Sequence, residues 1–464
     1  MLHPCQPPDE LGVSLPMRLF SLFLGLWLLF PAPVLAWSDH ARLSWSLLRT
    51  QPKLKQTVFA EPLESFLIDQ QAEISTTLAN VERWALREMP HYSKTPDDLR
   101  WRVSETIDDQ AFYSAIRVNP FLFYRLYIQE LPNCGPKLGK RVNWSELSFL
   151  GGGPSRFGVR YWSLLPGEEV SIAEVVASAS DEPDFGMDVG LFSDNGTEFG
   201  HRYGFGTQPF GNPNLEYGSQ APFHMGFYHL DWLTRLVEPN LLRTYPLWRI
   251  VLFGELAALA FKSEHPYWGW RFLGWGLHYI GDLAQPYHAV PLPGVSAIDA
   301  FLMVANGETK NGIQLVSNRH GVIESYHYQR MISMLSDQDW AASLLDISSS
   351  ANWETPLDYS DVKSLLTSTS AAAAEEFDQL IADNFPAQFV NDPTYEWVGS
   401  GQEDKIIDLV IEMKGLEAIK KLDAALIDQL KLFSLVASRW IARGLMVDKN
   451  QNEESNSVEN GLTR

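Results

Sequence analysis

The segment from Gly276 to His288, which reads GLHYIGDLAQPYH, constrains the fold more than any other part of this chain. His278 and Asp282 are four residues apart in an apolar, aromatic-rich stretch, so on a helix their side chains share one face. Pro286 ends that helix, and His288 can then return toward the same face. Two imidazoles and a carboxylate are donors that Zn²⁺ accepts. A buried helix with hydrogen-bonded histidines is the alternative interpretation, and this segment alone supports both about equally.

Composition and charge limit the class of protein. The 464 residues are 45% apolar and 12% aromatic, which is typical of a globular chain with a large core. The net charge of −21 argues against a broad nucleic-acid groove, because phosphate backbones are held chiefly by clusters of Lys and Arg. A phosphate ester at a metal site is still compatible with this charge, since the ion supplies the positive charge. We therefore expect no stable nucleic-acid partner.

Residues 1–36 have the pattern of an N-terminal extension followed by a signal peptide. The part from Met17 to Ala36 carries one Arg, a short apolar run, two prolines and small residues at its end. The apolar run is too short to span a membrane. We expect export to the periplasm or the medium, with Trp37 as the first residue of the mature chain and Cys134 as its remaining cysteine. Translation that begins at Met17 would give the same product.

Helical periodicity predicts the scaffold. Apolar spacing indicates helices over 61–88, 97–131, 171–178, 266–285, 371–383 and 402–447, and a further helix is expected to begin at Asn318. No repeat and no clear run of alternating strands is visible. The sequence therefore predicts an all-α fold, a single multi-helix domain over 37–447. The polar tail 448–464 is expected to be disordered.

One long segment, 181–222, departs from this pattern. It holds eight glycines and four prolines together with a spread of aromatic residues. Irregular segments of this length in a compact domain are usually functional or disordered. Two interpretations stay open, a lid over a site and an insertion packed on the surface.

Further candidate ligands lie on both sides of the central segment. His320 and Glu324 are again four apart on a predicted helix, a pattern that in isolation is typical of a solvated pair. The free amine of Trp37 would lie beside His40, three residues on. In chain order the candidates are Trp37, His40, Asp181 or Asp184, His224 with His229 as an alternative, His278, Asp282, His288, His320 and Glu324.

This order of residue types resembles the zinc-dependent phospholipase C and single-strand-specific nuclease superfamily. The match is carried by His278, Asp282, Gln285-Pro286 and His288, by the downstream His320 and Glu324, and by Trp37 at the expected mature N-terminus. The resemblance implies an all-α fold of the phospholipase C/nuclease type, with 181–222 as a long irregular insertion, and three zinc ions.

The resemblance also implies roles for single residues. One zinc would take Asp181, His224, His278 and Asp282; a second would take His288, His320 and Glu324; a third would take the amine and carbonyl of Trp37 with His40, and Asp282 would bridge the first and third. Asp181 is preferred to Asp184 because it follows a helix and small residues, and it is also a candidate general base. His91, His201, His265 and His327 are expected to be surface or core residues.

The functional expectation is an exported, zinc-dependent phosphodiester hydrolase of the phospholipase C type. Metal-activated water would cleave a phospholipid or another phosphodiester, with transient contact to a membrane surface. Two alternatives stay open, a single-strand nuclease or nucleotidase of the same superfamily and a non-catalytic zinc-binding protein. The sequence does not indicate the oligomeric state.

Overall fold

The computed structural model describes residues 39–122, 124–135, 137, 139–150, 159–211, 217–296, 302–303, 306–333 and 337–461, with side chains except at 309, 339 and 447–461. The expected signal peptide and Trp37 lie outside these residues. Helices make up 62% of the structure and strands 4%. The prediction of a mostly α-helical protein is confirmed.

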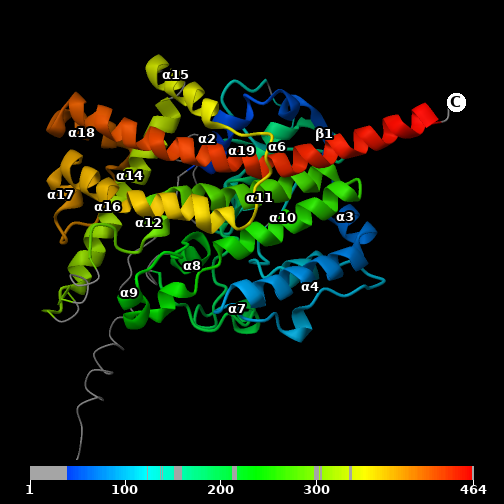
Figure 1. The fold of residues 1–464 in the computed structure, drawn as a ribbon, viewed down its shortest axis with the longest axis horizontal. Coiled ribbons are helices and arrows are strands. Elements are labelled where there is room, and N and C mark those ends of the chain that lie inside the picture. Colours follow the sequence, from blue (N-terminus) through cyan, green and yellow to red (C-terminus); the bar gives the residue numbers. More distant parts are fainter. Residues whose placement is uncertain are drawn as a thin grey trace, which may run out of the picture.

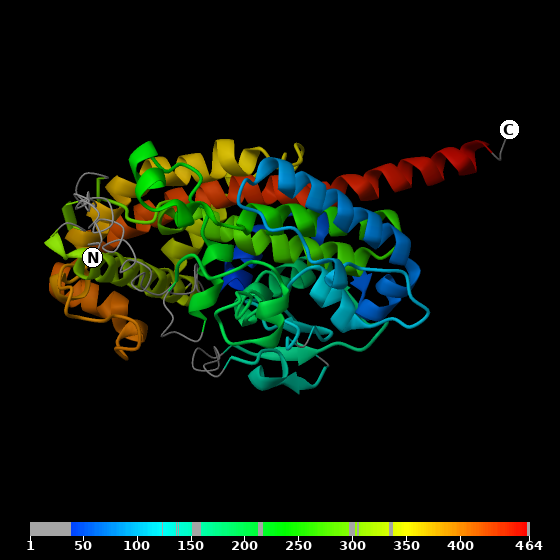
Figure 2. The same cartoon turned by 90° about the horizontal axis from the view of Figure 1, so that it is seen from below.

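Two long helices form the centre of the molecule (Figures 1 and 2), namely α10 (Pro246–Lys262) and α11 (Pro266–Ala284). Each begins with proline, whose fixed φ suits the first helical turn and whose missing N–H has no partner to lose there. Both are apolar around most of their circumference and pack along each other. Helices with this composition belong in the core.

Helix α11 is enclosed from several sides. Its neighbours in contact include α6 (Ile172–Ala179), α12 (Pro286–Ala289) and α19 (Leu416–Gly461). Among the described residues, one stretch, Pro239–Lys262, is long and apolar enough to cross a membrane by composition, and 83% of its most apolar window is buried inside the protein. A core helix has the same composition.

The remaining helices surround this centre. One end of the view in Figure 1 holds α14, α16, α17 and α18, while α3 and α4 lie toward the other end. Their bounds are α2 His40–Leu48, α3 Leu63–Asp69, α4 Gln71–Glu88, α5 Asp109–Ala115, α7 Glu198–Arg202, α8 Ala221–His224, α9 Trp232–Val237, α14 Thr309–Ser333, α15 Gln338–Ile347, α16 Ser368–Asn384, α17 Ala387–Val390 and α18 Ile406–Lys414.

In the described part of the chain, five short strands form two small antiparallel sheets. β1 (Thr57–Phe59) pairs with β5 (Glu169–Ser171), with Thr57 opposite Ser171. The second sheet has the order β2 (Tyr127–Gln129), β4 (Tyr161–Ser163), β3 (Arg141–Val142). Ser171 ends β5 and caps α6 by accepting a hydrogen bond from the N–H of Glu174. The sheets thus fix where α6 begins.

The helix predicted over 97–131 is wrong for most of that range. α5 ends at Ala115, and Arg117 adopts a left-handed backbone with φ of 51°. The guanidinium of Arg117 is buried and donates to the carbonyls of Ser93 and Tyr203. Tertiary hydrogen bonds therefore outweigh the helical periodicity here.

Helix boundaries near the C-terminus also differ from the prediction. Gly415, with φ of 84°, divides the helix predicted over 402–447 into α18 and α19. α19 runs on to Gly461, so the backbone of most of the tail 448–464 continues this helix and projects from the body (Figures 1 and 2). Residues 462–464 lie outside the described part.

The irregular segment 181–222 is packed into the protein over its described residues. Its buried aromatic side chains are Phe185, Phe192, Phe199, Tyr203, Phe205 and Phe210. Phe205 contacts the rings of Phe223, Tyr245 and Trp248 edge-on. This packing makes the segment a component of the core, and its role as a lid stays a prediction.

Candidate metal centre

Helix α11 presents His278 and Asp282 on one buried face, as their spacing predicts. Both side chains are fully buried, and His278 Nε2 lies 3.3 Å from Asp282 Oδ2. His278 Nδ1 lies 2.8 Å from the carbonyl of Ser180, just after α6. This contact sets the ring so that Nε2 faces the carboxylate.

Two residues from irregular parts of the chain meet this pair. His224, the last residue of α8, places Nδ1 2.9 Å from Asp282 Oδ2 and 3.0 Å from His278 Nε2. Asp184, in the turn Glu182–Phe185, has Oδ1 3.7 Å from His278 Nε2. Four donors from three segments converge on one point.

His40 approaches Asp282 from the opposite side. It is the first residue of α2, and its Nε2 lies 3.3 Å from Asp282 Oδ1 and 3.9 Å from Asp184 Oδ2. Asp282 thus turns one oxygen to His40 and the other to His224 and His278. A Cβ on Gly281 would lie 2.8 Å from His40 Nδ1, so glycine at this position lets α2 and α11 approach closely. We call His40, Asp184, His224, His278 and Asp282 the first ligand group.

A second ligand group consists of His288, His320 and Glu324. His288 lies in α12, and α14 carries the other two residues; this helix begins at Thr309, earlier than the predicted Asn318. His320 Nε2 is 3.1 Å from His288 Nε2 and 2.8 Å from Glu324 Oε1. All three side chains are buried.

His224 connects the two ligand groups. Its ring belongs to the first group, while its main-chain carbonyl lies 2.9 Å from His288 Nδ1. His288 therefore turns Nε2 toward His320 and Glu324. The two groups are parts of one buried centre.

The donor set fits a metal ion. The carboxylate oxygens of Asp282 and Glu324 are buried and have no hydrogen-bond donor in suitable geometry among the described residues. Leaving buried carboxylates without donors is costly, and a cation would satisfy them. Imidazole nitrogens of different residues also face each other at 3.0 and 3.1 Å, as ligands of a shared ion do. Nitrogen and carboxylate donors of this kind suit zinc.

The two groups differ in their electrostatics. Burial lowers the pKa of His224, but the charge of Asp282 and the contact with Asp188 outweigh it and raise the pKa to about 10. In the second group burial dominates: it lowers the pKa values of His288 and His320 and raises that of Glu324 well above its usual value. Carboxylate charge thus dominates at His224, although burial lowers the pKa of His278 in the same group, whereas burial dominates at all three ligands of the second group.

Asp181 and Asp184 have different surroundings. Asp181 Oδ1 accepts a hydrogen bond of 2.9 Å from the N–H of Ala41 at the start of α2. Burial and the charge of Asp39 raise the pKa of Asp181 to about 8. The three-residue groups of converging ligand atoms contain Asp184 and not Asp181. The structure thus brings Asp184 to the position for which the sequence favoured Asp181, and Trp37, expected beside His40, lies outside the described residues.

The remaining histidines lie elsewhere. His229 Nε2 is 3.0 Å from Thr367 Oγ1, and His265 Nδ1 is 2.8 Å from Glu61 Oε1. His91 and His201 are exposed. His327 is buried and lies on α14, with a pKa lowered by burial.

Sequence reasoning missed a buried acid behind His224. Asp188 is fully buried, and its Oδ2 lies 3.5 Å from His224 Nε2. Arg249 donates to Asp188 Oδ1 and Tyr279 donates to Oδ2. The signal was present in FGMDVGLF at 185–192, where a single ionisable residue sits among apolar ones.

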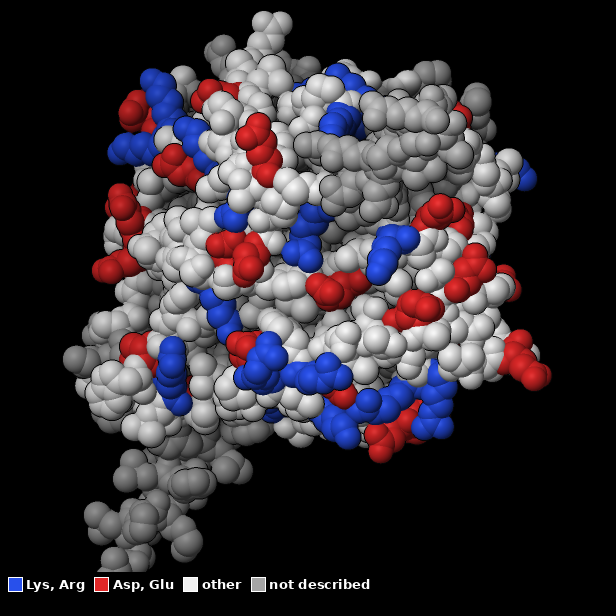
Figure 3. Space-filling view, turned by 45° about the vertical axis from the view of Figure 1, so that its right-hand side comes forward, with Lys and Arg blue, Asp and Glu red and all other residues white. Residues whose placement is uncertain are grey.

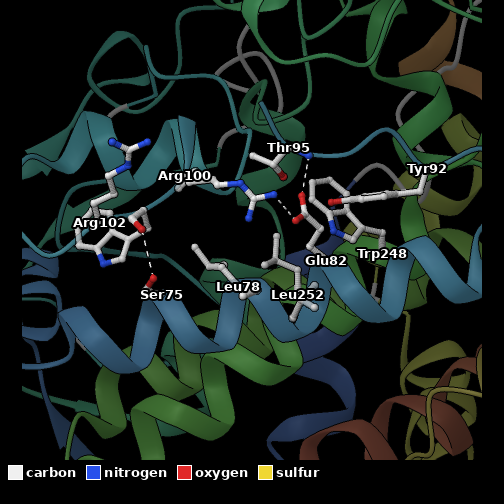
Figure 4. A pocket seen from close by; sticks show the side chains of 13 residues that line it. Ser75, Leu78, Glu82, Tyr92, Thr95, Arg100, Arg102, Trp248 and Leu252 are labelled. Atoms are coloured by element: carbon white, nitrogen blue, oxygen red, sulfur yellow. Dashed lines mark hydrogen bonds and ion pairs between the residues drawn. The ribbon is translucent and has the colours of Figure 1, made fainter. Parts of the chain in front are cut away.

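Of two cavities in the described part of the chain, one lies at the second ligand group and the other lies away from both groups. One reaches His320 and Tyr287 and is lined mainly by apolar side chains, among them Phe210, Met225 and Phe227. The other, of about 210 Å³, lies against α4 and contains none of the candidate ligands. Figure 4 shows Arg100 and Glu82 paired at its polar end, with Leu78 and Leu252 on its apolar wall.

Acidic and basic side chains are interspersed on the face shown in Figure 3, so they form no continuous basic groove there. Comparison with protein-family models, with curated proteins and with solved structures finds no match to this chain. The metal centre therefore rests on its own geometry.

Proposed function

We propose that the protein is a zinc-dependent phosphodiester hydrolase of the phospholipase C type, a member of the superfamily that its ligand order resembles. The observation that carries the proposal is Asp282, which presents one oxygen to His40 and the other to His224 and His278. A carboxylate shared in this way suits two neighbouring cations, and His288, His320 and Glu324 lie next to them as a further set.

The ions would supply an acidified water and positive charge for a phosphoryl oxygen. The residues of the chain hold that assembly in a fixed geometry: Ser180 and His224 carbonyls orient His278 and His288. Asp181 precedes Asp184 by three residues, and burial and nearby carboxylates raise its pKa to about 8, so the fraction that is ionised near neutral pH is a strong proton acceptor. We assign it the role of general base.

A lipid substrate is favoured over a nucleic acid. The cavity at His320 has a volume of about 40 Å³ and is walled mainly by apolar side chains, so it fits a small hydrocarbon group of a lipid better than a base that needs hydrogen-bond partners. The net charge of −21 disfavours a polyanion.

The test is hydrolysis by purified, zinc-loaded mature protein. We expect release of phosphorylated headgroup from phospholipid vesicles and little cleavage of single-stranded nucleic acid. Cleavage of nucleic acid without lipid turnover would select the nuclease alternative. Tight zinc binding without any hydrolysis would select the non-catalytic alternative.

A further inference from the structure

His224 is oriented differently from the other central imidazoles. His278 and His288 turn Nε2 toward the ligands and Nδ1 toward a main-chain carbonyl. His224 does the reverse, because Nδ1 faces Asp282 and Nε2 faces the carboxylate of Asp188 at 3.5 Å. That distance is longer than a normal hydrogen bond, and Nε2 has no other partner among the described residues.

Asp188 is held rigidly as an anion. Arg249, itself fully buried, donates to Oδ1 through Nε at 3.0 Å. Arg249 also donates to the carbonyls of Ile116 and Arg117 at 2.8 Å, so it has little freedom to move. Tyr279 donates to Oδ2 at 2.5 Å from α11, the helix that carries His278 and Asp282.

These contacts give Asp188 a defined task. We propose that Asp188 positions His224 for metal binding. Its carboxylate faces Nε2 as the acceptor for the Nε2–H proton, so this nitrogen keeps the proton and the lone pair of Nδ1 faces the first ligand group. A carboxylate partner also makes the imidazole a stronger donor than a carbonyl partner does. The proposal rests on the metal centre of the proposed function and adds a positioning residue to it.

The chain contains a matched arrangement without an imidazole. Asp423 on α19 accepts from Tyr326 Oη at 2.6 Å and from Arg330 Nη2 at 2.8 Å, so it has the same two kinds of partner as Asp188. Among the described residues its hydrogen-bond and ion-pair partners are Tyr326 and Arg330, so its loss removes an ion pair and a tyrosine hydrogen bond without touching an imidazole. Asp423→Asn is therefore the control for general damage to the fold.

The experiment compares metal retention in the zinc-loaded mature chain and in its Asp188→Asn and Asp423→Asn variants. A chelator titration measures the affinity of each ion, and the visible spectrum of the cobalt-substituted protein reports the ligand field. For Asp188→Asn we expect one ion to bind about 10–100-fold more weakly, with a shifted cobalt band. For Asp423→Asn we expect every ion to bind as in the wild type, even where the melting temperature falls.

Unchanged metal affinity and an unchanged cobalt spectrum in Asp188→Asn would overturn the proposal, as would an equal loss in Asp423→Asn. If Asp188→Asn does not fold, Tyr279→Phe serves instead, because it removes one anchor and keeps the carboxylate. A smaller weakening of the same ion is then expected, and no change in folded Tyr279→Phe would also overturn the proposal. Zinc binding without hydrolysis would contradict the proposed function alone. Failure to bind zinc would contradict both the proposed function and the positioning role of Asp188.

Discussion

The first ligand group gathers its side chains from four separate segments, whereas the second takes its three ligands from α12 and α14. The first contains two aspartates beside three imidazoles, and the pKa of His224 is raised to about 10 there. The second contains a single carboxylate, and burial lowers the pKa values of His288 and His320. The first group therefore depends on tertiary structure and on charge balance, while the second depends on local helix geometry and on burial.

Asp282→Asn is expected to have the largest effect, because this carboxylate lies 3.3 Å from His40 and 2.9 Å from His224, closer to both than Asp184 does at 3.9 and 3.8 Å. More than one zinc per chain should be lost and hydrolysis should fall to background. Loss of tightly bound metal corresponds to about 4 kcal/mol for an ion present at a thousand times its Kd, or a Tm lower by roughly 5 °C for each such ion. Metal analysis and calorimetry check this, and a variant with full zinc content would contradict the bridging role.

Glu324→Gln should damage only the second ligand group. Glu324 lies 2.8 Å from His320 Nε2, and among the described residues its ion pairs are with His320 and His288 of its own group. We expect one zinc per chain to be lost while the others stay bound with unchanged affinity, and activity to fall strongly. Stepwise chelator titration measures this; loss of all zinc together would show that the two groups are one cooperative unit.

Asp184→Asn and Asp181→Asn separate two neighbouring carboxylates. Asp184 lies among the converging ligand atoms and Asp181 accepts from the N–H of Ala41. Asp184→Asn should weaken zinc binding at the first group. Asp181→Asn should keep the zinc and lower the turnover number. Measuring zinc content beside kcat distinguishes the two, and the opposite pattern would restore the assignment favoured by the sequence.

Asp378→Asn should have the smallest effect. Asp378 accepts from Tyr287, whose ring stacks on His320, and pairs with Arg319. Burial raises the pKa of Asp378 above its usual value, so the folded protein protonates this carboxyl at a higher pH than the unfolded chain does. Its charged form costs stability at neutral pH, and that cost disappears as the pH falls through the folded pKa.

The difference in Tm between wild type and Asp378→Asn should therefore shift in favour of the wild type between pH 7 and pH 4. Thermal melts across that range measure it. A difference that does not vary with pH would mean that the carboxyl is not penalised by burial. Retention of all zinc by the variant is the accompanying control.

The parts of the centre that are local in sequence were predictable. His278 with Asp282, and His320 with Glu324, are separated by one helical turn, so a single helix fixes each pair. The sequence could not identify Asp184 as the ligand in place of Asp181, because both residues lie in one turn whose orientation depends on tertiary contacts. Glu182 between them is held by Arg271 and Trp275 of α11.

Long-range contacts also explain what was missed elsewhere. Asp188, Arg249 and Tyr279 are far apart in the chain, and no short spacing joins them. The helical prediction over 97–131 failed because the buried side chain of Arg117 binds distant carbonyls. The hydrophobic period of a sequence indicates which face of a helix or strand is buried, but it does not identify the residues that pack against that face.

The contact of His40 with Asp282 has a consequence for the chain as a polymer. Cys134 is free and the described residues contain no disulfide, so covalent cross-links do not restrain this part of the chain. An ion held jointly by His40 and Asp282 would instead close a loop that contains more than half of the sequence. On a chain-entropy estimate, closing a loop of that size lowers the conformational entropy of the unfolded chain by an amount worth about 5 kcal/mol. Metal release would then open a reversible cross-link. Chelation would remove the ion and would also free the segment between His40 and Asp282 from that constraint.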